Sequence, residues 1–83
     1  MLPIEASVDE LHRRVIEHIR ELAEQRGIAI SHLPDRAGVA RSHFWDVLAG
    51  RKSPTLSWLE RIAVALEVDV VELLLPPGKR REG

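Results

Sequence analysis

Residues 33–50 read LPDRAGVARSHFWDVLAG, and this stretch decides the fold. It holds two short segments with apolar residues at helical spacing, one on each side of Gly38, and Gly50 closes it. Glycine adopts the left-handed backbone conformation without steric cost, so it ends helices and permits tight turns. The stretch therefore predicts two short helices, over about residues 31–37 and 41–49, joined by a tight turn.

A longer helix is predicted before this pair, over about residues 8–26. Ser7-Val8-Asp9-Glu10 has the spacing of a capping box, and Gly27 follows as a C-terminal stop. Apolar residues recur at steps of three and four, which is the helical period. The expected core stripe is Val8, Leu11, Val15, Ile19, Leu22 and Ala23. The two histidines of this helix, His12 and His18, are expected at the surface.

The two short helices have weak start signals. In the first, Ser31 is the candidate cap, and Pro34 then falls in the first turn, where a missing amide costs little. The second has Ala40 at its cap position and therefore lacks a side-chain acceptor. Its apolar set is Phe44, Val47 and Leu48.

Two more helices are predicted after a basic loop that begins at Arg51. The fourth starts at Thr55 or at Ser57, and its expected stripe is Leu56, Leu59, Ile62, Ala63 and Leu66. A short fifth helix is capped by Asp69 and ends before Pro76. We found no alternation typical of β-strands, so the expected fold is all-α with five helices. Residues 1–7 are expected to be an N-terminal extension, 8–75 the domain, and 76–83 a charged, disordered tail.

Composition excludes several classes of protein. With 83 residues the chain suffices for one domain. It has no cysteine, which excludes disulfides and thiolate sites. It has no apolar run near the ~20 residues of a membrane helix, and no signal-peptide pattern. No metal-ligand set, phosphate loop or acid–base pair is evident. We therefore expect a soluble, cytoplasmic protein that is not an enzyme and needs no cofactor.

The net charge of −1 does not suggest a general polyanion binder. Its distribution is uneven, however, because residues 30–58 contain four basic and two acidic side chains. Contact with a nucleic acid is therefore expected to be local to this part of the chain.

The combined pattern of glycine and apolar positions resembles the Cro-like phage-repressor helix-turn-helix domain, also called the xenobiotic-response-element family. The resemblance covers about residues 16–75 and rests on Gly27, Leu33, Ala37, Gly38, Val39, Phe44, Val47, Gly50, Pro54, Leu56, Leu59, Ile62, Ala63, Ala65, Leu66 and Val68. It implies a five-helix, lambda-repressor-like DNA-binding domain that acts as a homodimer on a pseudo-palindromic operator. The chain departs from the family at Ala29 and Ile30, where serine or threonine followed by glutamine is usual.

The resemblance makes residues 41–49 the recognition helix, which places residues near its N-terminus against base edges in the major groove. The expected base contacts are Arg41, Ser42, Trp45 and Asp46, and the expected phosphate contacts are His43, Arg51, Lys52 and Thr55. Two alternatives remain for these residues. Asp46 can pair with Arg51 or Lys52 instead of a base, and Trp45 can lie against the core.

Leftover apolar residues near the C-terminal helix suggest an interface between two copies of the chain. The expected interface residues are Val71, Leu74 and Leu75. The leading functional hypothesis is a sequence-specific transcriptional regulator of double-stranded DNA, most simply a repressor. The alternative is a protein-interaction module or antitoxin-like regulator in which the helix-turn-helix binds a protein partner.

Overall fold

The computed structural model describes residues 8–75, and every regular element in that range is helical. The α-helices are α1 (Val8–Gln25), α2 (Leu33–Ala37), α3 (Arg41–Leu48) and α4 (Leu56–Leu66), with two 3₁₀ helices, η1 (Ile30–His32) and η2 (Val70–Leu73). The predicted all-α class is therefore confirmed. The predicted extension (1–7), the predicted tail (76–83) and the serine of the first capping box all lie outside the described residues.

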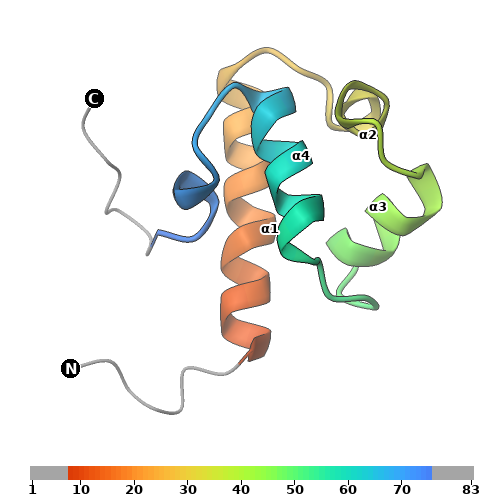
Figure 1. The fold of residues 1–83 in the computed structure, drawn as a ribbon, viewed down its shortest axis with the longest axis vertical. Coiled ribbons are helices and arrows are strands. Elements are labelled where there is room, and N and C mark those ends of the chain that lie inside the picture. The colour runs from red at the N-terminus through yellow and green to blue at the C-terminus, as the bar shows by residue number, and fades with distance from the viewer. Residues whose placement is uncertain (1–7, 76–83) are drawn as a thin grey trace.

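The helices enclose one small core. α1 and α4 lie side by side, α2 and α3 lie beyond α4, and η2 lies on the opposite side of the molecule from α3 (Figure 1). η2 packs against both α1 and α4. The hydrophobic core cluster draws buried residues from all four α-helices and η2: Val15, Ile19, Leu22, Ala23, Leu33, Phe44, Val47, Leu48, Trp58, Leu59, Ile62, Ala63, Ala65, Leu66 and Leu73.

Glycine and capping residues set most of the helix ends. Gly38 follows α2 with φ 70°, and Gly27 and Gly50 also have positive φ, as the sequence predicts. Thr55 caps α4, because its hydroxyl accepts a hydrogen bond of 3.1 Å from the Trp58 amide. This excludes the later start at Ser57. The Asp69 carboxylate accepts from the Val71 amide at 3.0 Å, which confirms the predicted cap.

Three expectations about local structure are wrong. The fifth helix is not an α-helix but the four-residue 3₁₀ helix η2. The segment expected as one short helix is divided into η1 and α2. Ser31 lies inside η1 and caps nothing, since neither η1 nor α2 has a side-chain cap. Pro34 does lie in the first turn of α2, and α3 lacks a side-chain cap at Ala40, both as predicted.

The expected core stripes also need correction. Leu56 is 77% exposed, because it is the first residue of α4 and precedes the packed face, on which Trp58 and Ala65 are buried instead. Leu11 of α1 is exposed as well. Spacing alone did not reveal where each helix emerges from the core.

The expectation that both α1 histidines lie at the surface is wrong. His18 is only 8% exposed, and its Nε2 donates a hydrogen bond of 2.7 Å to the Leu75 carbonyl. It lies on the α1 face that η2 covers. His12 is half-buried, and its Nε2 donates to the Val47 carbonyl at 3.0 Å. Each histidine thus links α1 to a segment far away in the chain.

Candidate nucleic-acid interface

α3 has one buried face and one largely exposed face. Phe44, Val47 and Leu48 point into the core. Arg41 and Ser42, in the first turn, are exposed. The turn that starts at Gly38 sets the direction of α3 relative to α2, and Val39 packs against the core below it. α3 therefore presents its N-terminal residues to solvent from a fixed position.

Aromatic rings fix the middle of α3 against α4. The Phe44 ring centroid lies 6.1 Å from that of Trp58 and 5.2 Å from that of Trp45, the latter in an edge-to-face arrangement. Trp45 is 38% exposed, so it combines packing against Phe44 with an open face. His43 is half-buried with its ring edge-on to Trp58 at 6.0 Å. His43 is thus partly turned toward α4.

Arg41 is held in an ion pair across the turn. Its Nε and Nη2 donate to the two carboxylate oxygens of Asp35 on α2, at 3.1 and 2.5 Å. These hydrogen bonds lower the pKa of Asp35 and raise the pKa of Arg41. Both side chains are well exposed, where an ion pair adds little to stability. The ion pair therefore orients the Arg41 guanidinium in the free protein. Because the pair is weak and exposed, another acceptor can still reach the guanidinium.

Asp46 is engaged in the same way with Arg51. The Arg51 Nε donates to Asp46 Oδ1 at 3.1 Å, which is one of the alternatives that the sequence left open. Lys52 is exposed beside it. The Thr55 hydroxyl is used as the α4 cap and lies 3.3 Å from the Ser57 hydroxyl. The structure thus brings the predicted residues to one region, but gives Asp46 and Thr55 partners within the protein.

Sequence reasoning missed two contacts in this region. The Asp35–Arg41 pair was not anticipated, although opposite charges six residues apart across a tight turn are a signal for it. On α4, Arg61 Nη1 donates at 3.4 Å to the Gly38 carbonyl, which ties that helix to the turn. A glycine carbonyl gives no sequence signal for such a bond.

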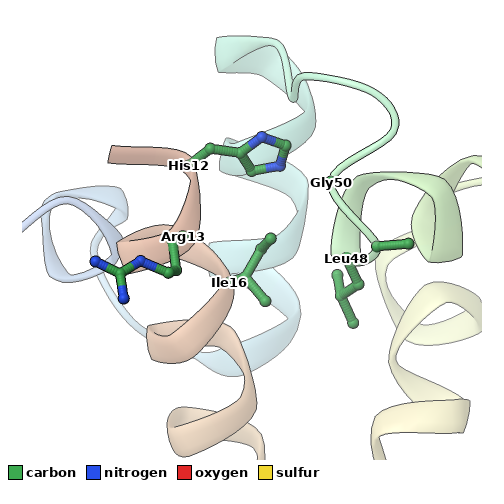
Figure 2. A pocket seen from close by; sticks show the side chains of 6 residues that line it. His12, Arg13, Ile16, Leu48 and Gly50 are labelled. Carbon is green, nitrogen blue, oxygen red and sulfur yellow. The ribbon is translucent and has the colours of Figure 1, made fainter. Parts of the chain in front are cut away.

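The described residues present no other candidate binding site. Among residues 8–75 no group of three or more histidine, aspartate or glutamate side chains is placed to hold a metal ion. Over the same range no helix is long and apolar enough to cross a membrane. The surface hollows are open, such as the one of about 310 Å³ between α1 and the end of α3 (Figure 2).

A family model described as a helix-turn-helix domain matches residues 17–75. The chain belongs to this helix-turn-helix family. The match covers α2, the turn and α3, and it confirms the resemblance found in the sequence.

Two curated relatives and one solved structure are similar to this helix-turn-helix domain. The HTH-type transcriptional regulator SutR of Escherichia coli is 29% identical over 70 residues, which are 84% of this chain and 39% of SutR. SinR of Bacillus subtilis is 29% identical over 59 residues, 70% of this chain and 53% of SinR. The chain therefore spans about half or less of each relative. A hypothetical transcription factor from Neisseria, NHTF, superposes with a TM-score of 0.75 at 29% identity, covering 93% of this chain and 90% of that one.

Proposed function

We propose that the protein is a sequence-specific regulator that binds double-stranded DNA, with α3 in the major groove. The observation that carries this proposal is the exposed first turn of α3, where Arg41 and Ser42 stand out from a helix whose other face is buried. An arginine there can donate two hydrogen bonds to guanine O6 and N7. The names of SutR and SinR as transcriptional regulators support the same role. The simplest form of such regulation is the repression of transcription.

The ion pairs of Arg41 and Arg51 favour specific over general binding. In each pair a carboxylate lies beside a cation that would face DNA. Asp35 and Asp46 repel phosphates, so they oppose contacts that depend only on charge. A base or phosphate has to displace the carboxylate from the guanidinium before it can accept hydrogen bonds from it. We therefore expect weak binding to random duplex relative to the preferred site.

Selection of bound duplexes from a random pool tests the proposal. An enriched sequence, with affinity that falls steeply as salt increases, is the expected result. If no duplex is enriched and binding is absent at low salt, the protein is not a DNA-binding regulator. The helix-turn-helix would then serve as a module for a protein partner.

Arg51 and Lys52 lie just after α3 and are proposed to contact phosphates. Arg51→Ala and Lys52→Ala should each weaken binding to all duplexes about equally and lower the salt slope by about one. Titrations at several salt concentrations, on selected and random duplexes, measure this. Because Arg51→Ala also releases Asp46 from its ion pair and leaves an unpaired carboxylate near DNA, it should have the larger effect of the two. A change in the preferred sequence would contradict the assignment.

We further propose a C2 homodimer that binds a pseudo-palindromic operator, with Val71, Leu74 and Leu75 at the interface. Val71 is 39% exposed, whereas Leu74 and Leu75 are half-buried and Leu74 already packs against the core. η2 lies away from α3 (Figure 1), so pairing there leaves the DNA-facing residues uncovered.

Sedimentation of the protein at micromolar concentration should show a dimer, and Val71→Asp should weaken it by at least about tenfold, because the charge would be buried in the contact. Val64→Asp is the matched control, since Val64 is 72% exposed on α4, outside the proposed contact. A monomer of the unmodified protein at high concentration, free or on DNA, would rule out the dimer. Equal weakening by both variants would place the interface elsewhere.

A further inference from the structure

The N-terminal half of α1 makes a long-range contact that the family match does not include. The matched residues begin at 17, whereas α1 begins at Val8. His12, which precedes the match, reaches across to the last turn of α3 and donates from Nε2 to the Val47 carbonyl at 3.0 Å. The contact joins residues 35 positions apart.

The acceptor is a carbonyl at the end of the recognition helix. The last carbonyls of a helix lack partners within the helix and carry its partial negative charge. Val47 already accepts from the Gly50 amide at 3.0 Å, and His12 adds a second donor to the same oxygen. A ring N–H at this position therefore stabilises the end of α3.

Apolar packing accompanies the hydrogen bond. Figure 2 shows His12 and Ile16 extending from α1 toward Leu48 and Gly50, while Arg13 points away. Ile16 packs against the core, and Leu48 is buried in it. The hydrogen bond from His12 therefore ties α1 to α3 beside this packing.

We infer that His12 is a positioning residue for the recognition helix, and that the N-terminal half of α1 acts as a brace on α3. His12 makes this contact from α1 at the last turn of α3, the opposite end from Arg41 and Ser42, so it sets the orientation of these two residues without touching DNA. The effect on DNA binding rests on the proposed function, but the brace itself does not.

Hydrogen exchange tests the brace without DNA. His12→Ala and His12→Leu should each make the amides of Ala49, Gly50 and Arg51 exchange about 2- to 10-fold faster, because a net hydrogen bond is worth about that factor. His12→Gln keeps a donor near the same place and should restore the original rates. Arg13→Ala, in the same hollow but bonded to Glu10, should leave them unchanged.

Unchanged exchange at these three amides in the alanine and leucine variants would overturn the inference, as would an equal increase throughout α1 and α4. In DNA titrations the same two variants should lose about 2- to 10-fold affinity for the selected duplex, with the salt slope unchanged and glutamine restoring it. If the exchange effect appears but no duplex is ever selected, the proposed function is wrong, but the inference that His12 positions α3 is retained.

Discussion

Replacing Phe44 by alanine is expected to lower the free energy of unfolding by about 3–5 kcal/mol. Phe44 is fully buried, and its ring lies near the rings of both Trp45 and Trp58. The cavity left by alanine cannot be filled without moving α3 toward α4. A chain of 83 residues is expected to have a total stability of roughly 4–12 kcal/mol, so this loss should be a large share of the total.

Urea denaturation followed by circular dichroism measures this loss. Ser42→Ala is the matched control on the same helix, because Ser42 is exposed and should change stability by less than about 0.5 kcal/mol. A loss below about 1 kcal/mol for Phe44→Ala would mean that α3 is not anchored by this ring. The proposed placement of its exposed residues would then lose its structural support.

Much of the fold follows from local signals in the sequence. Gly27, Gly38 and Gly50 have the predicted positive φ, and Asp69 is the predicted cap. Apolar spacing identifies most of the buried residues, since a helix packed on one side must repeat every three or four residues. The errors occur at helix ends, as at Leu56, where spacing continues but the packing surface does not.

The candidate site was predictable in its location but not in its contacts. A resemblance of spacing placed Arg41 and Ser42 on an exposed helix, because a helix-turn-helix fixes which face is buried. It did not predict that Asp35 holds Arg41, nor that His12 reaches Val47. Such contacts depend on how helices that are distant in the chain cross each other. Every residue has a backbone carbonyl, so the residue type does not show which carbonyl accepts a hydrogen bond.

Arg41→Ala should cost about 1–3 kcal/mol in binding to the selected duplex, because one bidentate contact to guanine is lost. The loss should nearly vanish on random duplex. The substitution also releases Asp35 from its ion pair, which leaves an unpaired carboxylate near DNA. The double variant Asp35→Asn with Arg41→Ala separates these effects, since it removes the contact without adding the repulsion. If the double variant recovers full affinity, Arg41 does not read a base.

Trp45 provides an independent signal from the same helix. It lies one turn after Arg41 and is 38% exposed, so its emission should change when the selected duplex is added. Trp58→Phe is needed as background, with circular dichroism to check that the fold is retained, because Trp58 also emits and packs against Phe44. If emission stays constant while binding is shown by another method, Trp45 belongs to the packing around Phe44 and not to the interface. If, in addition, Arg41→Ala weakens binding equally on selected and random duplexes, α3 does not enter the major groove by its first turn, and its exposed face is better assigned to a protein partner.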